Sequence, residues 1–367
     1  MNVGITGADG LLGYHVRARL HSMGASPARL ANRATFENAE RLDEFVRGLD
    51  AVIHFAGINR SSPDELEAGN IGIASELIAA FSRTGVTPTL VYANTTHAEL
   101  DTPYGRGKRG AAALFRDWGT SSGANFVDLV IPNVFGEFGR PYYNSGISTF
   151  CHQLAVGEAP TIIEDREIEL IHAQTVAQAC LDAASAGASG QQRLRGDKML
   201  VSTALQRLKD LHSTYLSGIM PNLTESIDLQ LFNTLRSYLF PDIYPVELKL
   251  NVDPRGSLFE AVKTIHGGQA FLSTTVPGIT RGNHFHLRKV ERFLVVGGEA
   301  EIQLRKLFDT KIHTYAVSGR RPCYIDMPTF HTHSIRNTGD GELTTLFWTN
   351  EIFDSADPDT FAEKVVG

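Results

Sequence analysis

The residues that open the chain constrain its fold more than any other stretch. A short apolar run at residues 2–5 leads into the glycine-rich segment 6–13, TGADGLLG, and a helical pattern follows. A strand, a glycine-rich turn and a helix in this order are typical of a dinucleotide site, with the phosphates at the helix N-terminus. Gly7 would allow the tight turn, Gly10 the approach of a pyrophosphate, and Gly13 close packing of the helix on the strand. The spacing is GxxGxxG rather than GxGxxG, so a glycine-rich turn without a ligand stays the alternative.

The composition indicates a folded, two-domain chain. Its 367 residues are 42% hydrophobic and 20% charged, which is the size of two domains rather than one. The net charge of −7 gives no electrostatic reason to expect nucleic-acid binding. No apolar run approaches the length of a membrane span, and the three widely spaced cysteines suit neither a disulfide framework nor a thiolate metal site. We therefore expect a cytoplasmic protein that acts on neither membranes nor nucleic acids.

Strand and helix patterns continue to alternate through the first half of the chain. Residues 50–57 have the pattern of a strand that ends in the small-residue turn FAG, and residues 88–93 form the next apolar run. Between them we expect a helix over residues 71–83, opened by Asn70. This alternation predicts a Rossmann-type α/β domain with a doubly wound parallel sheet, in which ligands bind at the carboxyl ends of the strands.

The second strand ends near a cation. NAD sites usually place an acidic residue at the end of this strand to hold the ribose hydroxyls. Here Arg33 stands at that place and no acid does, which favours the 2′-phosphate of NADP. A solvated surface arginine is the alternative.

Tyr104 and Lys108 are four residues apart, so on a helix they would lie on one face. The lysine charge should lower the pKa of the phenol and make it a usable proton donor or acceptor. A hydroxyl from Thr95 or Thr96 would lie beside them, because both residues follow the strand at residues 88–93. Tyr and Lys at this spacing also recur by chance in ordinary helices, so the motif gains weight only from its neighbours.

Together these motifs resemble the extended short-chain dehydrogenase/reductase family. The matching pieces are TGxxGxxG at residues 6–13, HFAG at residues 54–57, and the hydroxyl–Tyr–Lys set. The resemblance implies NADP(H) and hydride transfer on a sugar nucleotide, with Tyr104 as the acid/base. Lys108 would hold the ribose, and Thr95 would hydrogen-bond the reacting oxygen. The implied cofactor contacts are Gly7, Gly10, Leu11, Leu12, Gly13, Arg33, Phe55, Ala56, Gly57 and Lys108.

One departure from this family lies at the hydroxyl residue. The family often has a run of serines where this chain has Asn94, Thr95 and Thr96. A threonine hydroxyl can do the same work, so the choice between Thr95 and Thr96 stays open.

A further segment matches the family's substrate region. Residues 132–136, PNVFG, correspond to the turn that leads into it, and the resemblance implies that Asn133 contacts the nucleotide-sugar phosphates. Arg140, Tyr143 and Asn144 follow, and a cation with hydrogen-bond donors suits a diphosphate. A polar surface loop is the alternative.

From about Tyr244 the pattern changes to short alternating runs separated by Gly, Pro, Asp and Asn. This pattern predicts an all-β sandwich or barrel. We therefore divide the chain into residues 1–243, the NADP-binding reductase domain, and residues 244–367, the metal-binding domain. Two helical stretches at residues 200–240 should finish the first domain or pack at the domain interface.

The second half carries four residues with metal-ligating side chains. On a strand, His284 and His286 would point to one face, and Glu291 would reach the same pocket from the next strand. A histidine from the later run, His331 or His333, would complete the set. Imidazole and carboxylate ligands suit Zn, Fe, Ni or Mn, and we expect a divalent ion with zinc first.

This set resembles the two motifs of the cupin family, whose domains are β jelly rolls. His333 fits the family's fourth ligand better than His331, because Asn337 follows it at the family's spacing. The Pro-x-Gly of the second motif is missing, since Phe330 stands near the expected glycine.

End to end, the chain resembles the CapF (WbjC) enzymes of capsular and O-antigen polysaccharide synthesis. The resemblance implies a homodimer that acts on a UDP-2-acetamido-2,6-dideoxy-4-keto-hexose. The cupin would epimerise C3 and the reductase would reduce the C4 ketone, giving UDP-N-acetyl-6-deoxy-L-talosamine on the route to UDP-N-acetyl-L-fucosamine. The alternatives are a 4-keto reductase with a structural metal-binding cupin, or a non-enzymatic NADP-sensing scaffold. The role of the metal stays open, as does the epimerising base, for which His331, His313 and Tyr315 are candidates.

Overall fold

The computed structural model describes residues 1–249, 251–253, 256–258, 261–264 and 266–366. The chain forms two compact units, one of Met1–Gly146 with Glu164–Val201 and one of Ile147–Ile163 with Ser202–Gly367. The assignment of functions to residues 1–243 and 244–367 stays a proposal, because compactness does not test which residues carry which activity.

The first unit contains a six-stranded sheet in the order β2-β1-β3-β4-β5-β8, whose paired strands are all parallel. Its strands are β1 Val3–Thr6, β2 Arg29–Ala31, β3 Ala51–His54, β4 Thr89–Thr95, β5 Phe126–Ile131 and β8 Gly190–Arg193. A smaller sheet, β6-β7-β9, consists of Asn133–Phe135, Glu167–His172 and Asp197–Leu200. The predicted Rossmann-type parallel sheet is confirmed.

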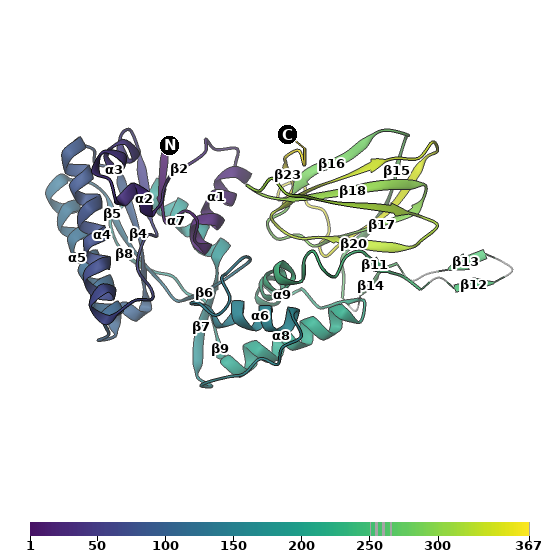
Figure 1. Ribbon diagram of the computed structural model, residues 1–367, viewed down its shortest axis with the longest axis horizontal. Coiled ribbons are helices and arrows are strands. Elements are labelled where there is room, and N and C mark those ends of the chain that lie inside the picture. The colour runs from purple at the N-terminus through teal and green to yellow at the C-terminus, as the bar shows by residue number, and fades with distance from the viewer. Residues whose placement is uncertain (250, 254–255, 259–260, 265, 367) are drawn as a thin grey trace. The chain divides into compact units, whose positions relative to one another are not determined.

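Helices cover both faces of the large sheet (Figure 1). They are α1 Leu11–Ser22, α2 Arg33–Phe36, α3 Ala39–Val46, α4 Pro63–Thr84, α5 Pro103–Ser122 and α7 Ala173–Ser185, with a 3₁₀ turn, η1, at Thr96–Glu99. Because strand side chains alternate between faces, Ile53 packs towards α1 and α7 while Val52 packs towards α3, α4 and α5. The carboxyl ends of β1, β3 and β4 therefore carry the loops that lead into these helices.

The helix α4 begins earlier than its sequence pattern indicates. Its N-cap is Ser62, which accepts a hydrogen bond from the Glu65 amide, and Pro63 occupies the first turn. Asn70 lies buried inside the helix, where its side chain bonds both the N–H and the carbonyl of Ile58. The expectation that Asn70 opens a helix is wrong, because its amide satisfies the loop after β3 rather than a helix terminus.

The second unit contains two five-stranded sheets with antiparallel pairing. One, in the order β11-β20-β17-β22-β15, consists of Val246–Glu247, Cys323–Met327, Glu291–Gly297, Leu343–Thr349 and Gln269–Thr275. The other, β19-β18-β21-β16-β23, consists of Ile312–Ser318, Glu299–Lys306, His331–Asn337, Thr280–Phe285 and Phe361–Ala362. Two short pairs complete the strands: β10 Ile219–Met220 with β14 Lys263–Thr264, and β12 Asn251–Asp253 with β13 Gly256–Leu258. The predicted all-β region is confirmed.

Three helices accompany these sheets: α6 Gly146–Ala155, α8 Val201–Leu216 and α9 Ser226–Leu239. The sequence pattern assigned α8 and α9 to the first domain or its interface, whereas nearly all of both belongs to the second compact unit. Tyr215 of α8 shows why, because its buried hydroxyl donates a hydrogen bond to Asp326 of β20.

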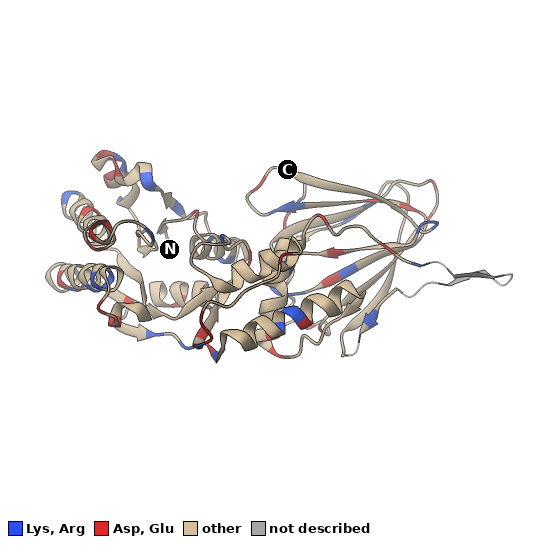
Figure 2. Cartoon of the chain, turned by 60° about the horizontal axis from the view of Figure 1, so that its bottom comes forward, with Lys and Arg blue, Asp and Glu red and all other residues tan. Residues whose placement is uncertain are grey.

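Acidic and basic residues are interspersed along the described chain (Figure 2). Among the described residues, no helix is both long enough and apolar enough to cross a membrane.

Candidate active site and metal-ligand cluster

The turn between β1 and α1 requires glycine at two positions. Gly7 has a φ of +65°, and a Cβ there would lie 2.9 Å from the Phe55 backbone. A Cβ on Gly13 would lie 2.6 Å from the Cα of Ala8, so this glycine permits close packing of the helix on the turn that follows β1. Gly10 is the helix N-cap and donates its N–H to the Gly7 carbonyl at 3.1 Å. The turn and the start of α1 line the cavity described next.

A cavity of about 620 Å³ lies at the carboxyl ends of the strands in the first unit. It brings together most of the predicted site, namely Gly7, Gly10, Leu11, Leu12, Gly13, Phe55, Gly57, Thr95, Tyr104, Lys108, Asn133, Arg140, Tyr143 and Asn144. Ala56, Arg33 and Thr96 are not among its lining residues. The glycine turn, the Tyr–Lys pair and the substrate loop therefore converge on one space.

Lys108 is buried on α5 and lies against β4. Its Nζ donates a hydrogen bond to the Ala93 carbonyl at 2.6 Å and lies 4.1 Å from the centre of the Tyr92 ring. Burial lowers the pKa of Lys108 to about 7, and the nearby Asp128 carboxylate acts in the opposite direction. The amine therefore titrates near neutral pH.

Tyr104 lies one turn before Lys108 on the same helix, as predicted. The expected lowering of its pKa is wrong, because burial, and then the neighbouring Tyr143, raise the pKa of Tyr104 to about 12. The phenol is consequently protonated at neutral pH and suits the role of proton donor.

Thr95 is the last residue of β4 and faces the cavity. Its Oγ1 accepts a hydrogen bond from the His97 N–H at 3.2 Å, which leaves its own proton available for donation. Thr96 belongs to η1 and does not line the cavity, so the geometry favours Thr95 as the hydroxyl of the set.

Arg33 is the first residue of α2, with its side chain 94% exposed and its Nε 3.0 Å from Glu37. Its predicted contact with a 2′-phosphate stays a prediction.

Sequence reasoning did not assign His97, which lines the cavity, or Arg60, which lies beside it against Tyr143. Arg60 lies 5.1 Å and Arg140 5.2 Å from the ring centre of Tyr143, and Arg60 also donates to the Tyr142 carbonyl at 3.0 Å. His97 lines the cavity, and its pKa is lowered by burial and by Arg166. Both follow the carboxyl end of a parallel strand, which is the signal that could have identified them.

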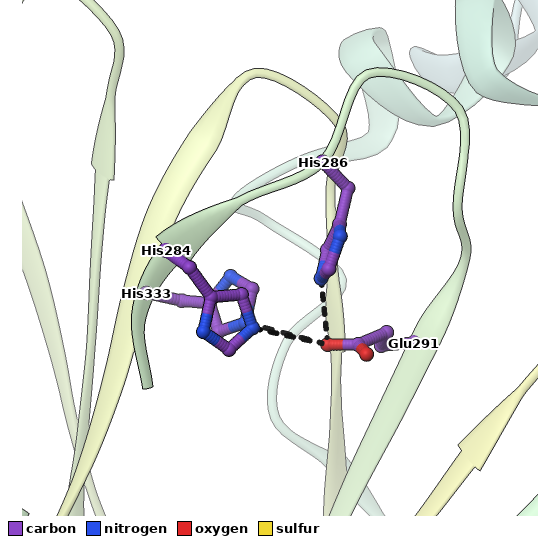
Figure 3. A group of neighbouring side chains, drawn as sticks. All are labelled: His284, His286, Glu291 and His333. Carbon is purple, nitrogen blue, oxygen red and sulfur yellow. Dashed lines mark ion pairs between the residues drawn. The ribbon is translucent and has the colours of Figure 1, made fainter. Parts of the chain in front are cut away.

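The four predicted metal-ligating residues of the second unit gather in one place (Figure 3). The ligand atoms of His284, His286, Glu291 and His333 all lie within 4.8 Å of one another. His284 and His333 face each other across β16 and β21, whereas Glu291 comes from β17 of the other sheet. The Oε2 of Glu291 lies 2.9 Å from His286 Nε2, 3.3 Å from His333 Nε2 and 3.9 Å from His284 Nε2.

The chemistry of this donor set fits a divalent cation. His286 Nε2, Glu291 Oε2 and His333 Nε2 are buried without a hydrogen bond among the described residues. The opposite ring nitrogens are engaged, since Nδ1 of His286 bonds the Asp359 carbonyl and Nδ1 of His333 lies 3.4 Å from the His331 carbonyl. Each Nε2 therefore presents its lone pair to the centre of the cluster, as metal ligation requires.

The candidate bases lie outside this cluster of four. His331 is buried and neutral, because burial lowers its pKa to about 3, and its ring lies 4.7 Å from Phe240. His313 packs on the same phenylalanine at 5.1 Å, and Tyr315 is half-buried on β19. The structure does not single out one of the three.

The fold and cavity define an enzyme of the nucleotide-dependent dehydrogenase class, and comparisons with known proteins agree. Residues 3–195 match the model of the NAD dependent epimerase/dehydratase family, and residues 251–361 match that of the polysaccharide biosynthesis C-terminal domain. The chain is 30% identical over its whole length, and over 99% of the relative, to UDP-2-acetamido-2,6-beta-L-arabino-hexul-4-ose reductase of Pseudomonas aeruginosa.

Solved structures give the same assignment. The capsular polysaccharide assembling protein CapF of Staphylococcus aureus is 31% identical, with both chains fully covered and a TM-score of 0.63. RMD of Pseudomonas aeruginosa, complexed with NADPH, is 19% identical over 65% of this chain and 99% of its own, with a TM-score of 0.53, which shows the fold alone. The chain belongs to the NAD dependent epimerase/dehydratase family and, along its full length, to the CapF type within it. It is therefore an enzyme, which excludes the scaffold alternative.

Proposed function

We propose that this enzyme reduces the C4 ketone of a UDP-2-acetamido-2,6-dideoxy-4-keto-hexose with NADPH, after epimerising its C3. The observation that carries the proposal is the single cavity that joins the glycine turn, the Thr95–Tyr104–Lys108 set and the loop of Arg140 and Tyr143. The Pseudomonas relative is by name a reductase of a UDP-linked 4-ketosugar, which supports this substrate class. The product would be UDP-N-acetyl-6-deoxy-L-talosamine, which lies on the route to UDP-N-acetyl-L-fucosamine.

The residues divide the work of reduction between them. Thr95 donates a hydrogen bond to the ketone oxygen, and Tyr104, protonated at neutral pH, delivers the proton to the same oxygen. Lys108 holds the ribose hydroxyls beside them. NADPH, when bound along the glycine turn, supplies the hydride. The guanidinium of Arg140 binds the diphosphate, for which its charge and fork geometry are suited.

The second unit would carry out the epimerisation as a cupin. His284, His286, Glu291 and His333 would hold a divalent ion such as zinc, which supplies Lewis-acid stabilisation of an enolate. A proton next to a ketone is acidic enough for a positioned base to remove it. His331, His313 and Tyr315 stay the candidates for this base. Reduction of C4 then removes the ketone and makes the new C3 configuration permanent.

A structural metal is the second candidate role for this cluster. His286, Glu291 and His333 are buried, and only His284 is more than 10% exposed, at 23%. Deuterium exchange at C3 of the substrate in D₂O without NADPH separates the two roles. Exchange supports epimerisation, whereas its absence in the metal-loaded enzyme leaves a reductase with a structural cupin.

The reductase proposal is tested with a panel of 4-keto UDP-sugars plus NADPH, with the products identified by NMR. Oxidation of NADPH by a 2-acetamido-2,6-dideoxy substrate would support it, and inactivity towards every member of the panel would contradict it. The proposal includes a cytoplasmic homodimer. Light scattering after size-exclusion chromatography would measure the mass of this dimer.

A further inference from the structure

The end of β4 is held by a buried side chain that the reaction itself does not use. Asn94 accepts the N–H of Thr95 at 2.9 Å and donates its own amide to Asp128 Oδ1 at 2.8 Å. Both Asn94 and Asp128 are buried. The backbone of the proposed catalytic threonine is therefore tied, through one amide, to a carboxylate on the neighbouring strand.

Asp128 lies on the same side of the sheet as Lys108. It is paired in register with Tyr92, and Tyr92 belongs to the core that packs under α3, α4 and α5. Lys108 extends from α5 and its Nζ lies over the ring of that same tyrosine, 4.1 Å from the ring centre. Side chains two residues apart on a strand share a face, so Asn94 joins this group from β4.

Asp128 has two further partners. Its Oδ2 accepts the amide of Gln191 at 2.9 Å, and the guanidinium of Arg116 lies 3.7 Å away. The Arg116 side chain is 58% exposed, whereas the Asp128 carboxylate is buried. Burial of a carboxylate is costly unless it is hydrogen-bonded and paired, so a second cation on the buried side of Asp128 is favourable.

We propose that Asp128 is a positioning residue for the ketone reduction: through Asn94 it fixes Thr95, and it is the counter-charge of Lys108. The inference rests on the proposed reductase function. Asn94 can link the two residues because its amide oxygen accepts from Thr95 while its amide NH₂ donates to Asp128.

The titratable groups around Lys108 support the claim that Asp128 is its counter-charge. Burial raises the pKa of Tyr92 well above its usual value and that of Tyr104 to about 12, so both are neutral at pH 7. His54 on β3 is also neutral, since burial lowers its pKa to about 3. The Asp128 carboxylate on β5 acts in the opposite direction to burial and raises the pKa of Lys108.

The test compares the Asp128→Asn variant with the wild-type enzyme and with Asp117→Asn, all as full-length chains. Asp117 is an exposed aspartate on the same helix as Lys108. Trace acetylation at different pH values, read on the Lys108 peptide by mass spectrometry, gives the titration midpoint of this lysine. We expect Asp128→Asn to lower the midpoint by about one pH unit and kcat by about 10- to 100-fold, with KM for the sugar nucleotide nearly unchanged. Asp117→Asn should change none of these.

Asn94→Ala separates the two tasks of Asp128, because it removes both hydrogen bonds of the link. It should lower kcat through the loosened Thr95 while leaving the Lys108 midpoint in place. If Asp128→Asn does not fold, Asn94→Ala tests the inference alone, and an unchanged kcat overturns it.

A purely structural Asp128 would lower the melting temperature without moving the Lys108 midpoint, and that result overturns the inference. Failure of the reductase proposal would give a different result. The wild-type enzyme would then reduce no 4-keto UDP-sugar, and Asp128 would have no role in reduction. The shift of the Lys108 midpoint in Asp128→Asn would still establish the Asp128–Lys108 pair.

Discussion

Lys108 Nζ lies 2.6 Å from the carbonyl oxygen of Ala93, so the one buried cation of the proposed set is tied directly to the strand that ends in Thr95. The contact links α5, which carries Tyr104, to β4, which carries Thr95. It also holds the Lys108 amine in a buried position, and burial lowers the pKa of this amine.

Replacement of the phenol should separate the two proposed activities. Tyr104→Phe removes the proton donor but little volume, so we expect NADPH oxidation to fall by about 10²- to 10⁴-fold. Deuterium exchange at C3, which we assign to the metal-binding cluster, should continue at the wild-type rate. Both are measured on the same preparation by absorbance and NMR. Loss of both activities in a folded variant would refute this division of labour.

Removal of an outer partner should weaken metal binding. The Asp359 carboxylate accepts the N–H groups of Leu287, Arg288 and Lys289, and its carbonyl bonds His286. Asp359→Ala should therefore misplace His286 and lower zinc affinity by about 10- to 100-fold, measured by competition with a chromophoric chelator.

Asp357→Ala is the matched control for this change, because Asp357 is exposed and bonds the Arg288 side chain instead. Equal zinc affinity in both variants and the wild type would show that Asp359 does not orient the cluster.

Cofactor preference should depend on the start of α2. Arg33→Ala should weaken NADPH binding by about tenfold and leave NADH binding unchanged, since a charge-assisted bond to the 2′-phosphate would be lost. Glu37→Gln should strengthen NADPH binding, because Glu37 competes for the same guanidinium at 3.0 Å. Both are read from the quenching of protein fluorescence. Exposed Arg41 on α3 serves as the control, and equal effects of Arg33→Ala and Arg41→Ala would mean a general surface charge effect.

A buried histidine should make the first unit sensitive to acid. Burial lowers the pKa of His54 from 6.5 to about 3, so between these values the unfolded chain binds a proton that the folded chain excludes. Stability from this group is therefore full above about pH 6.5 and falls as the pH drops towards 3, by up to about 1.4 kcal/mol per pH unit.

His54→Asn should flatten this slope, whatever it does to the absolute stability. The measurement is the change in urea midpoint between about pH 7 and pH 5, where the histidine begins to titrate in the unfolded chain. Replacement of exposed His21 by Asn should leave the slope as it is. An unchanged slope in His54→Asn would show that this histidine is not the acid-sensitive group.

Local patterns were sufficient for the backbone framework of both units. Gly7 and Gly13 stand where a side chain would collide with the backbone, so their spacing alone predicts the turn between β1 and α1. The separation of Tyr104 and Lys108 predicts a shared helix face in the same way. The HxH pair and Glu291 likewise predict a common ligand cluster, although His286 lies one residue beyond β16 and Glu291 lies on β17 of the other sheet.

Burial and long-range pairing were decided by the tertiary structure. The pKa of Tyr104 moves opposite to the sequence-based expectation, because burial and Tyr143, which is distant in sequence, raise it. Asn70 looked like a helix start, yet its role depends on the loop at Ile58, twelve residues away.

Tertiary structure also brought Asp128 to Asn94, and it brought together the ligand atoms of the metal-ligating cluster in the second unit. Asn94 and Asp128 lie 34 residues apart and meet only because β4 and β5 are neighbours in register. The sequence alone predicted which residues could carry chemistry and determined how they are spaced along each element. Only the packed structure determined their dielectric surroundings and distant partners, since solvent exclusion depends on segments that no local pattern contains.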